Sequence, residues 1–175
     1  MKKTGIVVFV AMIAFMVSSF NVNKTEVLEE KEALTWYTDL DEVHALSEKS
    51  GKPIFGFFTG SDWCGWCHKL QREVFAKEAF VTWAKQNVIL LELDFPRKTQ
   101  LPAELAKQNR ELQQAFAVTG YPTVWIFNAE KDAKTDHFNL TALGKLGYPR
   151  GATPGKEEVK FISDADALLA KNPKK

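Results

Sequence analysis

The only two cysteines of this 175-residue sequence, Cys64 and Cys67, are separated by Gly65 and Trp66. A thiolate is both a nucleophile and a metal ligand, so such a pair can exchange disulfides, bind a metal or hold a haem. A disulfide across the two intervening residues would close too small a loop to stabilise the fold by restricting the unfolded chain. Reactivity therefore explains the pair better than stability does.

The cysteine pair follows a strand pattern and opens a helix pattern. Residues 54–58 form a continuous apolar run, which is typical of a strand covered on both faces. Residues 60–63 then carry turn and helix N-cap chemistry. Unpaired N–H groups at a helix start stabilise a thiolate. We therefore expect Cys64 to attack a disulfide and Cys67, one turn further on, to resolve the mixed disulfide.

The other segments alternate between strand and helix patterns, which predicts an α/β fold with one mixed β-sheet flanked by helices. The expected strands are a weak one at Leu34–Tyr37 and others at 54–58, 88–94, 123–127 and around 143–148, with a hairpin turn at 128–132. The expected helices lie over 39–49, from Cys64 towards Trp83 with a bend or break near Phe75–Phe80, and over 101–116. A C-terminal helix is opened by Thr153-Pro154, and its inward-facing residues are expected to be Val159, Ile162, Leu168 and Leu169.

A second motif, Gly120-Tyr121-Pro122-Thr123, opens the third strong strand. Together with Trp63–Cys67 it resembles the thioredoxin superfamily, and the resemblance extends over nearly all of the chain after residue 34. It implies a thioredoxin-like fold in which Pro122 is cis and packs beside the cysteine pair. There Pro122 would keep metals off the thiols and leave the Tyr121 backbone free to pair with an extended substrate strand.

More narrowly, residues 57–64 and 93–96 resemble exported bacterial Dsb-type thioredoxin-like proteins. This resemblance implies a protein-disulfide oxidoreductase of reductase or isomerase type, with catalytic Cys64 and Cys67. The sequence shows no flavin, nicotinamide or metal motif, so we expect no cofactor; the partners would be disulfide-bearing client proteins and a separate redox partner protein. Neither Gly65 nor Trp66 is charged, which favours a mildly reducing role. Trp63 and Trp66 are expected to form an exposed apolar rim for unfolded substrate.

Thioredoxin itself has a buried aspartate before the cysteines and a lysine on the next strand. Here those places fall among residues without an ionisable group: Gly56, Phe57, Phe58 and Leu90. Glu92, His68 and water are left as candidate proton acceptors for Cys67.

The stretch from Asp94 to Gly120 is longer than in thioredoxin. Because parallel strands end at the same edge of a sheet, the loop Phe95–Leu101 should emerge beside Cys64. It either shapes the substrate groove or is a neutral surface insertion. The basic pair Arg97-Lys98 is interpreted as part of a solvated loop.

The N-terminus reads as a secretory signal: a basic start at Met1–Lys3, the uncharged apolar run Gly5–Val17, and small residues after it. The predicted organisation is a signal peptide or uncleaved anchor at 1–20, a linker at 21–31 and one thioredoxin-like domain at 32–175. The protein should therefore be exported, to the periplasm, with membrane attachment only if the signal is retained. A net charge of +1 gives no reason to expect nucleic-acid binding.

Two alternatives use the same residues. The sequence from Cys64 to His68 matches C-x-x-C-H, the haem attachment pattern. All three methionines lie within the predicted signal, so His44 or His137 would have to supply a sixth iron ligand. A non-enzymatic metal carrier would use both thiolates and His68. No metal site is predicted, since zinc sites usually assemble four spaced ligands.

Overall fold

The computed structural model describes residues 33–171. The predicted signal segment and linker lie outside the described residues, so these assignments and the domain boundary at residue 32 stay predictions. Among residues 33–171, no helix has the length and apolar character needed to cross a membrane.

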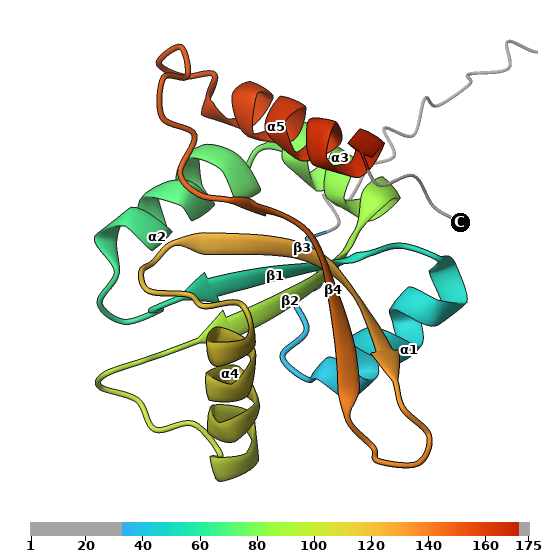
Figure 1. The fold of residues 1–175 in the computed structure, drawn as a ribbon. Helices are drawn as coiled ribbons and strands as arrows, with labels where there is room; N and C mark the ends of the chain where they lie inside the picture. The colour runs from blue at the N-terminus through green and yellow to red at the C-terminus, as the bar shows by residue number, and fades with distance from the viewer. Residues whose placement is uncertain (1–32, 172–175) are drawn as a thin grey trace, which may run out of the picture. The chain divides into compact units, whose positions relative to one another are not determined.

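The fold is built on a four-stranded sheet in the order β2-β1-β3-β4. The strands are β1 (Ile54–Thr59), β2 (Ile89–Asp94), β3 (Thr123–Lys131) and β4 (Phe138–Leu146). β1 is parallel to β2 and antiparallel to β3, and β3 is antiparallel to β4. The sheet is therefore mixed, as predicted, and β1 and β2 both end at the edge from which the cysteine segment leaves (Figure 1).

Helices cover both faces of this sheet (Figure 1). One face carries α2 (Gly65–Leu70), α3 (Glu78–Asn87) and α5 (Glu157–Lys171). The other face carries α1 (Leu40–Ser50) and α4 (Ala103–Ala115). The prediction of an α/β fold with flanking helices is confirmed.

β1 is buried at every position, and its side chains alternate between two hydrophobic clusters. Phe55 and Phe57 point to the cluster that contains both cysteines, whereas Ile54 and Phe58 belong to the cluster on the α1–α4 face. At Gly56 an added Cβ would lie 3.0 Å from the Phe127 ring. The apolar run predicted as a doubly covered strand thus has helices on both sides.

The helix that begins after Cys64 changes its winding before it ends. α2 passes directly into a π-helical segment, η1 (Gln71–Phe75), and the chain leaves the helix at Ala76 before α3 begins. This confirms the predicted break near Phe75. Phe75 is buried and packs against the rings of Phe55, Phe57 and Phe80, which ties this irregular segment to the core.

Helix α1 has defined ends. The Asp39 carboxylate accepts the Glu42 N–H at its start, and Gly51 ends it in the left-handed region, with φ 65° and its N–H donating to the Ser47 carbonyl. Only glycine adopts this conformation without cost. These caps explain why the helix predicted over 39–49 forms over 40–50.

Two predicted strands differ from the structure. Leu34–Tyr37 contributes only one bridge, between Tyr37 and Leu91, instead of a strand. The hairpin turn predicted at 128–132 is wrong, because β3 continues to Lys131 and the turn lies at 132–137, where the Asp132 carboxylate accepts two backbone N–H groups. β4 correspondingly begins at Phe138 instead of residue 143. Pairing between β3 and β4 outweighs the turn propensity of the polar segment.

The inward position predicted for Val159 is also wrong. Val159 is 53% exposed, and the buried residues of α5 are Phe161 and Ala165. Ile162, Leu168 and Leu169 do pack against the core. The helix is therefore rotated from the predicted face so that the Phe161 ring enters the aromatic cluster.

Phe161→Ala should destabilise the fold by about 3–5 kcal/mol, because the Phe161 ring is 1% exposed and packs against Phe55, Phe75 and Phe80. Val159→Ala, two positions earlier on the same helix, is the matched control and should change stability by less than about 0.5 kcal/mol. Urea denaturation measures both. Equal losses would mean that α5 docks through a different face.

Candidate active site

Cys64 and Cys67 form a disulfide. Cys64 is the N-cap residue of α2, and its sulfur accepts the backbone N–H of Cys67 at 3.2 Å. Cys64 is 5% exposed and Cys67 0%, so Cys64 is the sulfur that a partner reaches first. A hydrogen bond to sulfur favours its anionic form, and this one is donated to Cys64.

Trp63 is the aromatic residue that connects the cysteine segment to its neighbours. Its ring lies against Gly60, where an added Cβ would stand 2.4 Å from the nearest ring atom. The Trp63 indole N–H donates to the Phe95 carbonyl at 2.8 Å. The ring also meets Tyr121 edge-on at 5.7 Å and lies beneath the Arg97 guanidinium at 3.7 Å. Trp63 is half-buried, so the prediction that it forms an exposed rim is wrong.

The Tyr121–Pro122 peptide bond is cis, as the resemblance implied. Tyr121 stacks on Phe95 at 5.2 Å, and its hydroxyl accepts the Gln113 side-chain N–H at 2.7 Å. Burial, with a smaller contribution from a nearby carboxylate, raises the pKa of the Tyr121 hydroxyl. Through the Trp63–Tyr121 contact, the two motifs recognised in the sequence lie at one site.

Trp66, between the two cysteines, is 57% exposed. Its ring meets Tyr148 at 5.2 Å, and the Lys69 ammonium lies 5.0 Å from the Trp66 ring centre and 4.9 Å from that of Tyr148. The Tyr148 hydroxyl donates to Glu73. This hydrogen bond is the main cause that lowers the pKa of Glu73 and raises that of Tyr148. Of the two tryptophans, Trp66 alone presents a largely exposed ring.

Asp62 holds the loop Phe95–Leu101 against the cysteine segment. Its carboxylate accepts the backbone N–H groups of Arg97, Lys98 and Thr99 at 2.6–3.2 Å. The Arg97 N–H is the largest of the causes that lower the Asp62 pKa. The prediction that this loop emerges beside Cys64 is confirmed by these contacts (Figure 1).

Asp94, at the end of β2, makes a second connection. Its carboxylate accepts the Ser61 N–H at 2.8 Å and the Ser61 hydroxyl at 2.5 Å. The Ser61 carbonyl in turn lies 2.7 Å from Nε2 of His68, so that ring nitrogen donates to it. Asn109 of α4 is 1% exposed and donates to the Asp94 carbonyl at 2.9 Å. The turn after β1, the end of β2 and the middle of α4 are thereby joined.

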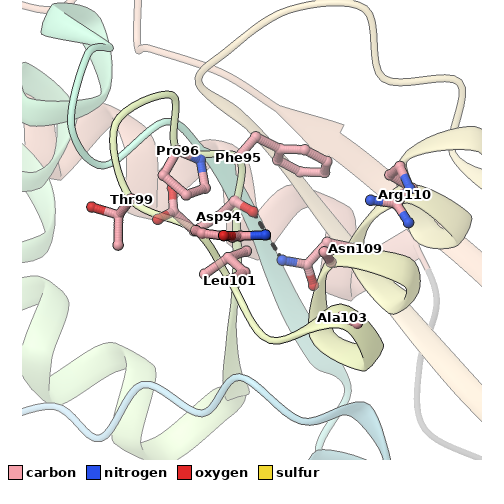
Figure 2. A pocket seen from close by; sticks show the side chains of 10 residues that line it. Asp94, Phe95, Pro96, Thr99, Leu101, Ala103, Asn109 and Arg110 are labelled. Atoms are coloured by element: carbon pink, nitrogen blue, oxygen red, sulfur yellow. Dashed lines mark hydrogen bonds between the residues drawn. The ribbon is translucent and has the colours of Figure 1, made fainter.

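A cavity of about 480 Å³ lies between the loop Phe95–Leu101 and α4. Figure 2 shows the loop side chains on one side of it and Asn109 and Arg110 on the other, with the Asn109–Asp94 hydrogen bond between them. The residues that line it are Asp94, Phe95, Pro96, Thr99, Gln100, Leu101, Ala103, Ala106, Asn109 and Arg110.

Two of the candidate proton acceptors can now be placed. His68 is engaged with the Ser61 carbonyl. Glu92 lies on the same face of β2 as Leu90, a member of the cluster that contains the cysteines, and pairs in register with Phe57. Burial, followed by repulsion from Asp94, raises the pKa of Glu92. Glu92 is thus a carboxyl group on the sheet face that carries the active pair.

Among the described residues, the structure supplies no further ligands for haem attachment or for a metal carrier, the two alternatives that use the same cysteines. Within residues 33–171, no three histidine, cysteine or acidic side chains gather as a group that could hold a metal ion. His44 packs on Phe138, at the start of β4. His137 lies in the β3–β4 turn, and the strand register places that turn at the opposite end of β1 from the cysteines.

Sequence reasoning missed Asp62 and Tyr148, and interpreted Arg97 as solvated. A turn residue directly before Trp63 was a signal for Asp62, since short acidic side chains cap turns. Tyr148 is separated from its partner Glu73 by 75 positions and left no local signal.

The comparisons with known proteins agree with this geometry. A family described as thioredoxin-like matches residues 35–129, which is more than half of the chain and includes both cysteines. The chain therefore belongs to the thioredoxin-like family.

Individual relatives point to one branch of that family. The chain is 40% identical over 84 residues to the disulfide bond reductase DsbH of Chlamydia pneumoniae, a match that covers 48% of this chain and 51% of the relative. It also resembles the solved structure of a DsbH oxidoreductase, with a TM-score of 0.65, 29% identity and coverage of 79% of this chain and 86% of that one. The chain spans about half the length, or less, of the curated relatives that it matches.

A thioredoxin from Thermus thermophilus has a TM-score of 0.53 and 16% identity, over 80% of this chain and 90% of the other. At this identity the likeness shows the shared fold.

Glu92→Gln should raise stability by an amount that depends on pH. A raised pKa means that ionisation of Glu92 opposes folding. The contribution of protonated Glu92 to wild-type stability is therefore complete below the ordinary pKa, and it is lost as the pH rises through the raised pKa. The melting temperature of the variant, relative to wild type, should therefore increase between about pH 4 and pH 7.

Glu104→Gln changes an exposed glutamate of α4 and is the matched control, expected to stay within about 2 °C of wild type. If the difference in melting temperature between Glu92→Gln and wild type did not change with pH, the claim that ionisation of Glu92 opposes folding would be contradicted.

Proposed function

We propose that this protein is a thiol:disulfide oxidoreductase that acts on protein disulfides, and that its net direction is reduction. The observation that carries the proposal is the Cys64–Cys67 disulfide at the start of α2, with the Cys67 N–H donating to the Cys64 sulfur. Membership of the thioredoxin-like family and the similarity to DsbH support the same activity.

The reaction begins with the reduced pair. The Cys64 thiolate attacks one sulfur of a client disulfide; a new bond to that sulfur forms, the client S–S bond breaks, and the other client sulfur leaves as a thiolate that takes a proton. Cys67 loses its proton and attacks the Cys64 sulfur, which releases the second client thiolate. Two electrons pass to the client, and the pair ends as the disulfide seen in the structure.

Cys64 is the attacking residue in this proposal and Cys67 the resolving one, in agreement with their exposed fractions of 5% and 0%. Client binding is assigned to Trp66, Trp63, Tyr121 and Pro122. The exposed Trp66 ring offers an apolar surface, and the half-buried Trp63 contacts the Tyr121 ring edge-on. The backbone at Tyr121 would pair with an extended client segment.

Reduction is favoured over isomerisation by two observations. Neither Gly65 nor Trp66 carries a charge, and the 40% identical relative is named a disulfide bond reductase. Isomerisation and reduction share the first attack by Cys64. They differ at the mixed disulfide, because in isomerisation a client thiol releases Cys64, whereas in reduction Cys67 does so. Burial of Cys67 directly beside Cys64 favours the resolving step.

The electrons consumed must be returned by a separate redox partner protein that reduces the Cys64–Cys67 disulfide. The proposed compartment is the periplasm, supported by the signal-like residues 1–20. The partner would reach the same exposed side of Cys64 that meets the clients.

Replacing the cysteines one at a time should give different results. Cys67→Ser leaves the attack intact and removes the resolving thiol, so mixed disulfides with client proteins should accumulate through Cys64. Cys64→Ser removes the nucleophile and should give none. Non-reducing gels of cells that express each variant measure this, with a reduced sample and the double variant as controls. Adducts with neither single variant would favour the haem or metal alternatives instead.

The direction of transfer is tested by the reduction potential of the pair, measured against glutathione. A reductase is expected near about −200 to −270 mV. A value near about −120 mV, typical of a strong oxidant, would contradict the reducing assignment.

A further inference from the structure

Arg97 is a cation at the active-site edge whose charge has no carboxylate partner among residues 33–171. It is exposed, and its guanidinium lies 3.7 Å from the centre of the Trp63 ring. No ion pair joins it to an acidic side chain within the described part of the chain. Lys69, the cation on the Trp66 side, is already 3.9 Å from Glu73.

The position of Arg97 is set by the fold. Its backbone N–H donates to Asp62, which also binds the next two N–H groups of the loop. Trp63, the ring beneath the guanidinium, is held by its own hydrogen bond to the Phe95 carbonyl. Both supports come from the segment that leads into Cys64, so Arg97 is tied to the attacking cysteine through Asp62 and Trp63.

The carboxylates nearby are turned towards the protein. The oxygens of Asp62 accept loop N–H groups, those of Asp94 accept Ser61, and those of Glu73 accept the Tyr148 hydroxyl and an Arg72 N–H. The acceptors at this edge are therefore occupied, whereas Arg97 keeps donors facing solvent. A ring-stacked guanidinium with free N–H groups binds a carboxylate in a planar, two-point geometry.

We propose that Arg97 is a specificity-determining residue that pairs with an acidic side chain of the client close to the client disulfide. The proposal rests on the function given above and names the class of client: proteins with Asp or Glu within about three residues of the reducible cysteine. The limit of three residues is set by chain geometry, since three extended residues span roughly 10 Å and Arg97 lies on the ring of Trp63, the residue directly before Cys64.

The pairing is tested with two synthetic peptides that each contain one disulfide and differ only in having Glu or Gln two residues from a cysteine. Pre-reduced protein is mixed with each peptide, and the rate of thiol release is measured in a single turnover. The readout is the ratio of the two rates within each variant, so an overall change in rate cancels. Wild type should reduce the Glu peptide about two- to fivefold faster, the range expected for one exposed ion pair.

Arg97→Gln should bring this ratio to about one. Arg97→Lys should give an intermediate ratio, because it keeps the charge and loses the planar donors. Raising the salt from about 0.01 M to about 1 M should abolish the preference in wild type, since the screening length falls to about 3 Å.

Lys49→Gln is the matched control, because it removes the same charge at an exposed position of α1. Lys49 precedes the start of β1, whereas Cys64 follows its end, and six strand residues separate the two by roughly 20 Å. This variant should keep the wild-type ratio. A wild-type ratio of one, or an unchanged ratio in Arg97→Gln, would overturn the inference while leaving the proposed function standing. Failure of wild type to reduce either peptide would instead remove the proposed function and this inference with it.

Discussion

β1 is buried on both faces, and this burial sets the position of the cysteine segment and of the loops around it. All six of its residues are buried, and a side chain at Gly56 would displace the Phe127 ring. Such a strand has no freedom to shift in register, because a slip by one residue would exchange its two buried faces. Its end therefore fixes where Cys64 begins α2, and Cys64 in turn meets the N–H of Cys67.

Around that fixed point the protein joins three loops by polar contacts. Asp62 accepts the N–H groups of the loop after β2, Asp94 accepts Ser61 from the loop after β1, and Trp63 connects both to Tyr121. Each carboxylate accepts more than one donor, and hydrogen bonds to an ionised group are stronger than neutral ones. The loop between β2 and α4 is thus held at the edge that carries the cysteines.

The edge of the sheet that carries the cysteines presents two kinds of side chain, one apolar and one cationic. The exposed Trp66 ring offers apolar contact, and the Arg97 guanidinium on the Trp63 ring offers hydrogen-bond donors. Of the two cysteines, Cys64 is 5% exposed and Cys67 is fully buried. Glu92 adds a carboxyl group of raised pKa on the sheet face that belongs to the cysteine cluster.

Features with a local signal could be predicted from the residues alone: the apolar run of β1, the cysteine pair at a helix start, the break near Phe75 and the motif at Pro122. Burial periodicity and cap chemistry act over a few residues, so these features could be predicted. Packing between segments sets where the β3–β4 turn falls, that Val159 faces solvent, that Trp63 is half-buried, and that Asp62 holds Arg97 over Trp63. Each depends on a partner distant in the chain, 35 positions away for Asp62 and Arg97, and no local pattern of residue types records which distant partner a side chain meets.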